Sequence, residues 1–463
     1  MRSPIILILF LFVAAIAGLL ISHYPPGNLL WGSLAITIFA VSFINIEWGL
    51  YILIFSMLLS PEIIVGQTEG GASGRGVTLR FEDFLLAVIG LSWFAKNAVH
   101  KELGLFLKTP LNKAILIYVL ACVVSTGFGI IAGRVSTKTG TLFVLKYIEY
   151  FIVFFMIVNH VKNTDQIHRF VFCLFLTCFI TAVIGIVQIP GGGRVSAPFE
   201  GDIGEPNTFG GYLLFIGTIA AGLFAMVKTS KARHILAVLI LVIIPPFLFT
   251  QSRSSYLALI PACLVLGLMM ERRVIILGVL ALSFLLSPLF LPSAVKQRIM
   301  YTFNQPHASA QINVGDIRLD TSTSARLTSW KEALRDWPKH PLFGYGITGY
   351  AFVDAQFPRV LLETGIVGLI AFIYLLYSIL KLTLDILKKT KTPYFKGIGI
   401  GFLAGYTGLL FHAIGANTFI IVRIMEPFWF FVGIIAVLPA MEPQLDDPPQ
   451  EFAIAGKAAT AGL

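Results

Sequence analysis

The chain has 463 residues, of which 57% are hydrophobic and only 13% are charged. Ordinary soluble domains carry about 25% charged residues, so this composition excludes a soluble enzyme and favours a single polytopic membrane domain. The net charge of +10 could suit a nucleic-acid binder. However, the basic residues lie between apolar runs, as topology signals do, and we expect no nucleic-acid partner.

Membrane-crossing helices are the predicted elements along the whole chain. A hydrocarbon core of roughly 30 Å is crossed by about 20 mostly apolar residues in a helix. Such runs predict an all-α transmembrane bundle of about 12–14 spans within residues 1–441. They cover residues 4–22, 29–46, 49–65, 82–99, 114–133, 141–158, 168–189, 209–227, 235–250, 255–271, 274–291, 364–384, 396–414 and 418–439.

The two ends of the chain carry further expectations. We interpret residues 4–22 as a retained first span, with a cleaved signal peptide as the alternative. Residues 442–463 are acidic and then rich in alanine and glycine, which is typical of a disordered tail.

The distribution of lysine and arginine predicts the orientation of the spans. If the N-terminus is cytoplasmic, the short outside connections hold few basic residues, namely Arg75, Arg80, Arg134, Lys138, Arg194 and Arg253. The inside connections hold many more, including the cluster Lys388, Lys389 and Lys391. The positive-inside rule therefore predicts that both termini are cytoplasmic.

The longest polar segment covers residues 292–363 and is predicted to lie outside, because long loops cross largely regardless of charge. Within it, Leu327, Trp330, Ala333, Leu334 and Trp337 follow a helical period after serines and threonines. This pattern predicts an amphipathic helix on the membrane surface. Long polar loops in compact proteins are usually functional, so we expect the site on this face.

Two short outside connections carry candidate ligand-binding residues. Arg253 stands among hydroxyls and an amide in QSRSS, residues 251–255, where a guanidinium can make a forked contact to phosphate oxygens. An interfacial anchor is the alternative. Arg194, Glu205 and Asn207 lie in a glycine-rich connection that permits close backbone approach.

Further candidates lie near the last three predicted spans. Asp354, Arg359 and Glu363 stand just before the span at 364–384, where they could supply a base and an anion contact or form a solvated salt bridge. Arg423 and Glu426 are three residues apart on the last span, and His412 and Asn417 precede them. A lone histidine there is more often a packing residue than a reactive group.

Six segments together resemble the O-antigen ligase/polymerase superfamily over most of the chain. They are RFED (80–83), RVSAPFE with EPN (194–200, 205–207), QSRSS (251–255), SARLTSW (324–330), HPLFGYG (340–346) and ETGIVG (363–368). The resemblance implies a GT-C-like bundle that acts on undecaprenyl-diphosphate-linked glycans at the outer face of the bacterial inner membrane. It also implies that Arg194 and Arg326 contact the lipid diphosphate, with Arg253 as a third contact.

One departure from the family pattern shifts the expected reaction. Ligase members carry a histidine nine residues before the Glu-x-Gly that opens the next span, and here that position is Asp354, followed by Ala355. The missing histidine favours a polymerase of O-antigen or exopolysaccharide. We therefore assign Asp354 as the first candidate base and Glu205 as the second, with Asn207 and Arg359 as further substrate contacts.

The expected reaction is glycosyl transfer without a metal or other cofactor, from a lipid-diphosphate donor to a glycan acceptor in the bilayer. A chain-length regulator is a further expected partner. Ligation of a finished glycan to lipid A core or to a protein is the alternative. A flippase for lipid-linked oligosaccharide is the alternative from another class, but it would need a charged path through the bundle.

Overall fold

The computed structural model describes residues 26–64, 78–99, 109–200, 204–305, 311–314 and 317–442. The predicted span at 4–22 and the predicted tail beyond residue 442 lie outside these residues. The chain divides into two compact units. The first takes in residues 1–53 and 82–105, and the second takes in residues 54–81 and 106–463.

The first unit contains α2 (Pro26–Ile44), most of α4 (Phe81–Val99) and the beginning of α3 (Ile46–Leu59). Two hydrogen bonds join α4 to α2. Ser92 Oγ donates to the carbonyl oxygen of Phe39 at 3.0 Å, and Lys96 Nζ donates to that of Ile44 at 2.9 Å. These bonds give polar side chains on α4 a partner within the unit.

The second unit is a helical bundle with two small antiparallel ladders. The ladders pair β1 (Glu62–Ile64) with β2 (Thr78–Arg80), and β3 (Asn313–Val314) with β4 (Ile317–Arg318). The helices are α5 (Asn112–Ile131), α6 (Thr137–His160), α7 (Thr164–Gln188), η1 (Ile189–Gly191), α8 (Pro206–Met226), α9 (Ser230–Phe249), α10 (Arg253–Leu268), α11 (Arg273–Phe290), α12 (Ser293–Asn304), α13 (Thr321–Asp336), η2 (Trp337–Lys339), α14 (Gln356–Lys389), α15 (Pro393–His412), η3 (Thr418–Ile420) and α16 (Val422–Met441).

The helices confirm an all-α polytopic membrane fold. Each predicted span from 29–46 onward coincides with one described helix. By length and composition, 7 described helices can cross a membrane: α5, α6, α7 with η1, α8, α9, α14 and α16. Shorter apolar stretches occur in α2, α3, α10 and α11.

Small residues allow α8 and α15 to pack backbone against backbone. Gly397, Gly401 and Gly405 are four residues apart and therefore share one face of α15. A Cβ atom on Gly222 of α8 would lie 2.5 Å from the carbonyl oxygen of Gly397 and from the amide nitrogen of Gly401. This close approach is the usual way in which helices associate inside a membrane, where lipid supplies no hydrophobic drive.

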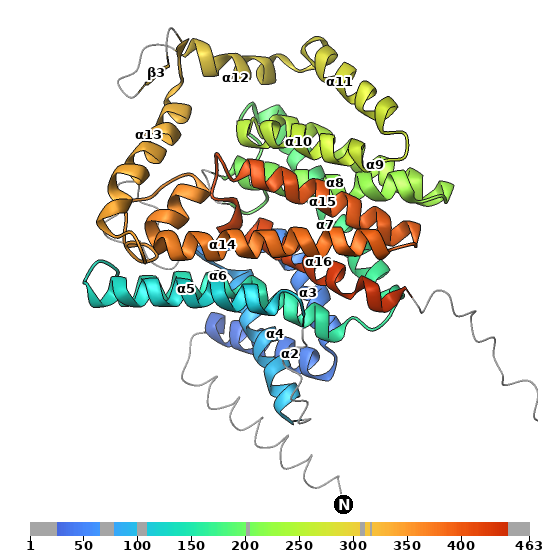
Figure 1. The fold of residues 1–463 in the computed structure, drawn as a ribbon. Helices are drawn as coiled ribbons and strands as arrows, with labels where there is room; N and C mark the ends of the chain where they lie inside the picture. Colours follow the sequence, from blue (N-terminus) through green and yellow to red (C-terminus); the bar gives the residue numbers. More distant parts are fainter. Residues whose placement is uncertain are drawn as a thin grey trace, which may run out of the picture. The chain divides into compact units, whose positions relative to one another are not determined.

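Within the described part of residues 292–363, α12 and α13 lead from α11 back to the start of α14 (Figure 1). The amphipathic helix predicted near 321–337 is present as α13, whereas α12 was not predicted. The apolar face of α13 packs on protein: Trp330, Ala333 and Trp337 lie against a cluster that includes Val353 and Leu362. Leu327 and Leu334 remain exposed. The periodicity therefore predicted the helix, but it did not predict that the apolar face of the helix packs on protein.

Backbone contacts fix the glycine-rich turn 340–346 against the first turns of α14. Gly365 has a φ of 65°, and this non-helical residue separates a short helix from the long apolar part of α14. The amide of Tyr345 donates to the carbonyl oxygen of Leu362 at 2.8 Å, and the amide of Gly346 donates to that of Glu363 at 2.9 Å. A Cβ atom on Gly344, whose φ is 68°, would lie 2.4 Å from the oxygen of Leu362. The turn therefore requires glycine for both conformation and space.

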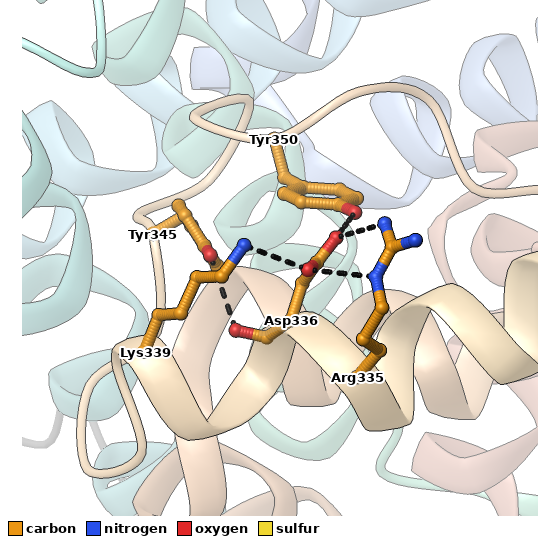
Figure 2. A network of polar contacts seen from close by, with 5 residues as sticks. All are labelled: Arg335, Asp336, Lys339, Tyr345 and Tyr350. Atoms are coloured by element: carbon orange, nitrogen blue, oxygen red, sulfur yellow. Dashed lines mark hydrogen bonds and ion pairs between the residues drawn. The ribbon is translucent and has the colours of Figure 1, made fainter.

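A network around Asp336 closes the end of α13 (Figure 2). Its carboxylate accepts hydrogen bonds from Lys339 Nζ at 2.8 Å, Tyr350 OH at 2.6 Å and Arg335 Nη2 at 3.0 Å. Tyr345 OH donates to the Asp336 carbonyl oxygen at 3.1 Å. Hydrogen bonds from Arg335, Lys339 and Tyr350 hold the pKa of Asp336 well below its usual range. The network ties α13 to the turn that follows it.

Candidate functional site

The site is built first from the connection between η1 and α8, which carries Arg194. Arg194 Nε donates to the carbonyl oxygen of Thr250 at 3.0 Å, and its Nη2 donates to that of Gln251 at 3.4 Å. The amide of Val195 donates to the carbonyl oxygen of Phe249 at 2.9 Å. These bonds dock the connection on the α9–α10 turn and leave the rest of the guanidinium available to a ligand.

A buried ion pair holds the same connection from the other side. Arg423 of α16 is fully buried, and its Nη1 lies 3.4 Å from Glu200 Oε1 and donates to the carbonyl oxygen of Pro198 at 2.8 Å. Glu200 Oε2 accepts the amide of Glu205 at 2.7 Å. The arginine on the last span therefore positions the connection that carries Arg194.

The α9–α10 turn supplies the second part of the site. Gln251 adopts a φ of 49°, and Ser252 caps α10 by accepting the amide of Ser255 at 3.3 Å. Ser252 Oγ donates to Asn207 Oδ1 at 2.8 Å, which places Asn207 beside the turn. Arg253 Nη2 lies 2.6 Å from Asp320 Oδ2, so the turn is also linked to the residue just before α13.

Four arginines from four separate segments lie within electrostatic reach of one another. They are Arg194, Arg253, Arg298 of α12 and Arg326 of α13. Partial burial, and then the charges of Arg298 and Arg253, lower the pKa of Arg194 to about 10. Partial burial also lowers the pKa of Arg298 and Arg326, and Arg253 adds to both shifts. We call these four residues the arginine cluster.

The arginine cluster has fewer negative than positive charges. Asp320 interacts with Arg253, Arg298 and Arg326, and Asp354 interacts with Arg326. Like charges that depress one another's pKa are stabilised when an anion enters between them. Guanidinium groups also present planar, forked donors that match phosphate oxygens. The arrangement is therefore suited to an anion with several oxygen atoms, such as a diphosphate.

The candidate acid–base residues have different surroundings. Asp354 is partly exposed and lies near Arg326, at the edge of the arginine cluster. Glu205 stands at the N-terminal end of α8, and its Oε2 accepts a hydrogen bond from the Thr208 hydroxyl at 2.9 Å, whereas its side chain makes no hydrogen bond to a backbone amide of the helix. His412 is fully buried, and its Nδ1 lies 2.8 Å from Thr418 Oγ1. Of these three residues, Asp354 is partly exposed and also lies beside a positively charged residue, Arg326.

Arg359 lies in a separate set of contacts. Its Nε donates to Glu363 Oε1 at 3.0 Å, and both side chains are largely buried. Tyr147 OH donates to Glu363 Oε2 at 3.4 Å, and the amide of Thr348 donates to Oε1 at 3.3 Å. The pair joins α6, α14 and the turn before α14, so these contacts favour a positioning role for Arg359.

Sequence reasoning missed Arg298 and Asp320. Arg298 lies on α12, an amphipathic segment of low hydropathy that begins directly after Pro292, and this helix start was a usable signal. Asp320 immediately precedes α13 and is buried, which nothing in the local pattern indicates. Only the folded path of the long loop brings both residues to Arg253.

Comparison with known protein families identifies the central part of the chain. Residues 236–373 match the family model described as O-antigen ligase. The matched stretch runs from α9 into α14 and contains Arg253, Arg298, Arg326 and Asp354. It confirms the resemblance to the O-antigen ligase/polymerase superfamily, whose members are glycosyltransferase-like membrane enzymes with lipid-linked glycan substrates. No curated protein matches the chain.

Proposed function

We propose that the protein is a polymerase-type glycosyltransferase that joins undecaprenyl-diphosphate-linked repeat units at the outer face of the bacterial inner membrane. The observation that carries this proposal is the convergence of Arg194, Arg253, Arg298 and Arg326, which come from four separate segments. A site that only anchored the loop in lipid would not require positive charges to be gathered against their mutual repulsion. A leaving group that carries a diphosphate explains that arrangement.

The arginine cluster would act on the bond that breaks. An acceptor hydroxyl oxygen attacks the anomeric carbon of the donor, and the bond from that carbon to the diphosphate oxygen breaks with its electron pair leaving on the diphosphate. Negative charge therefore grows on the leaving group during the reaction. Preorganised guanidinium groups stabilise such charge without having to reorient, which lowers the barrier.

Asp354 is the proposed general base for the acceptor. As the new glycosidic bond forms, the acceptor hydroxyl proton passes to the Asp354 carboxylate and is then released to water. Asp354 interacts electrostatically with Arg326, so the carboxylate lies beside the arginine cluster that would hold the donor. Glu205 is the second candidate, although Thr208 already donates to its carboxylate.

Ligation of a lipid-linked glycan to lipid A core or to a protein is a second candidate function. It is favoured by the description of the family that matches residues 236–373, O-antigen ligase. Both reactions use the same donor and differ in the acceptor. The aspartate at the position where ligases carry a histidine, Asp354, favours polymerisation.

Deletion of the protein in its host, followed by analysis of surface and lipid-linked glycans, separates the candidates. Loss of a polymerase leaves single repeat units on the final acceptor. Loss of a ligase leaves long glycan on the lipid carrier. A flippase would move the lipid-linked donor across reconstituted vesicles without forming a glycosidic bond, and that result would overturn the glycosyltransferase proposal.

A further inference from the structure

A second basic site lies away from the arginine cluster, in a groove between the turn after α5 and the turn after η2. The groove has a volume of about 360 Å³, and its lining includes Arg134, Lys339 and His340 together with Phe128, Ile131 and Leu342. Arg326 and Asp336 are ten residues apart on α13, which is about 15 Å along a helix. Lys339 and His340 follow three and four residues after Asp336, so the length of α13 separates this groove from Arg326.

The charged side of the groove has an unfilled donor. Arg134 Nη1 lies 2.8 Å from His340 Nε2 and 3.0 Å from its Nδ1, and the guanidinium lies 5.9 Å from the centre of the Tyr345 ring. Arg134 Nε is buried and has no hydrogen-bond partner among the described residues. The Arg134 guanidinium therefore keeps hydrogen-bonding capacity beyond its contact with His340, in a groove that it lines.

His340 does not neutralise the positive charge of Arg134. Partial burial, and then the charges of Arg134 and Lys339, lower the pKa of His340, so its ring is neutral at pH 7. Lys339 pairs with Asp336 at 2.8 Å, and the residues that line the groove include no carboxylate. Arg134 therefore gives the groove a net positive charge that complements an anion.

The other side of the groove is apolar and exposed. Ile131 is 85% exposed, Leu342 is 58% exposed and Phe128 is 48% exposed. Ile131 is the last residue of α5, a helix long and apolar enough to cross a membrane. The groove therefore lies where hydrocarbon gives way to headgroups, and a ligand there would meet apolar side chains and cations together.

We propose that this groove binds the phosphate group of an anionic membrane lipid, with Arg134 as the main phosphate contact and the lipid chain along Phe128, Ile131 and Leu342. The phosphate accepts hydrogen bonds from Arg134 and Lys339. The chemistry is shared by a polyprenyl phosphate and an anionic phospholipid. This binding does not depend on the reaction proposed above.

Binding of farnesyl phosphate to the purified full-length protein in detergent tests the inference. Two molecules should bind per chain, one in the groove and one at the arginine cluster. Arg134→Ala should remove one molecule or weaken it about tenfold, as expected for a charge-assisted hydrogen bond. Lys138→Ala is the matched control, because it removes the same charge from an exposed position next to the same turn.

Further variants and competing ligands separate the contributions of charge, lipid chain and protein stability to binding. Arg134→Lys should recover part of the binding, and thermal unfolding of each variant should resemble that of the wild type. Ile131→Ser should weaken farnesyl phosphate but not inorganic phosphate. Displacement by phosphatidylglycerol identifies a phospholipid as the natural occupant, whereas displacement by undecaprenyl phosphate alone identifies the polyprenyl carrier.

The outcomes distinguish this inference from the proposed function. If Arg326→Ala still binds two molecules while Arg134→Ala binds one, the groove is supported and the diphosphate assignment of Arg326 fails. If Arg134→Ala binds as well as Lys138→Ala, the groove proposal is overturned. Equal affinity for inorganic phosphate and farnesyl phosphate in the wild-type groove would overturn the lipid part of the proposal.

Discussion

Arg253 Nη2 lies 2.6 Å from Asp320 Oδ2, and this ion pair joins the start of α10 to the residue that precedes α13. The Asp320 side chain is 2% exposed, whereas that of Arg253 is 16% exposed. The aspartate is therefore fixed within the protein, while part of the arginine can still meet a ligand. This contact attaches the long loop to the short turn that carries Arg253.

Asp320→Asn should loosen the attachment of the long loop. The substitution keeps the size of the side chain but leaves Arg253 without its carboxylate partner, a loss of about 1.5–3 kcal/mol for a hydrogen bond to a charged group. We expect faster limited proteolysis within residues 292–363, and pyrophosphate should restore protection by supplying negative charge. Asp385→Asn is the control, because Asp385 is 48% exposed and lies 4.0 Å from Lys388. Equal cleavage of the two variants would contradict the prediction.

Arg326→Ala should abolish most glycan polymerisation. Removing one preorganised donor from a site that stabilises developing negative charge lowers turnover about 100-fold. Arg326→Lys should retain part of the activity, because it keeps the charge but loses the forked geometry. Lys331→Ala removes an exposed charge from the same helix and should leave polymer length unchanged. Polymer length on surface glycan, with membrane insertion checked by protease protection, is the measurement.

Asp354→Asn should stop transfer while donor binding persists. An amide cannot accept the acceptor proton at pH 7, but it leaves the arginine cluster in place. Glu205→Gln should have a smaller effect, because Asp354 remains as the base and an amide oxygen can still accept the hydrogen bond from Thr208. Turnover and binding of the lipid-diphosphate donor should be measured separately on the two purified variants. Greater loss of turnover in Glu205→Gln would move the role of base to Glu205.

Glu200 and Arg423 should prove strongly coupled in a double-mutant cycle. Glu200→Gln removes the carboxylate that lies 3.4 Å from the fully buried Arg423, and breaking a buried pair costs about 3–5 kcal/mol. Arg423→Gln should destabilise by a similar amount, and the double variant should lose less than the two single losses combined. Unfolding in detergent measures each term. Simple additivity would indicate that the pair does not hold the connection in place.

Gly344→Ala should destabilise the turn before α14. The residue has a φ of 68°, and a Cβ atom would lie 2.4 Å from the carbonyl oxygen of Leu362, so both conformation and space oppose the substitution. Gly191→Ala is the control, since a Cβ atom there meets nothing within 4 Å. We expect a lower unfolding temperature for Gly344→Ala alone.

Local sequence patterns located the helices, because an apolar run or a helical period depends only on residues that are close together in the chain. An apolar run in a membrane must form a helix to satisfy its own backbone, so α5, α8 and α16 lie where hydropathy predicts them. The helical period of Leu327, Trp330 and Trp337 likewise predicted α13. The period did not reveal that Trp330 and Trp337 pack on protein, because the partner surface comes from residues 353–362.

The partners of charged side chains could not be predicted in the same way, because the path of the whole chain decides which charged groups come together. By itself, the sequence determined a polytopic membrane protein, its superfamily resemblance and the candidate arginines Arg194, Arg253 and Arg326. Only the tertiary structure brought Arg298 and Asp320 to those arginines and showed that the Arg359–Glu363 pair is buried against Tyr147 of α6. Electrostatic interactions depend on distance in space, and residues as far apart in the chain as Arg194 and Arg326 become neighbours only through folding.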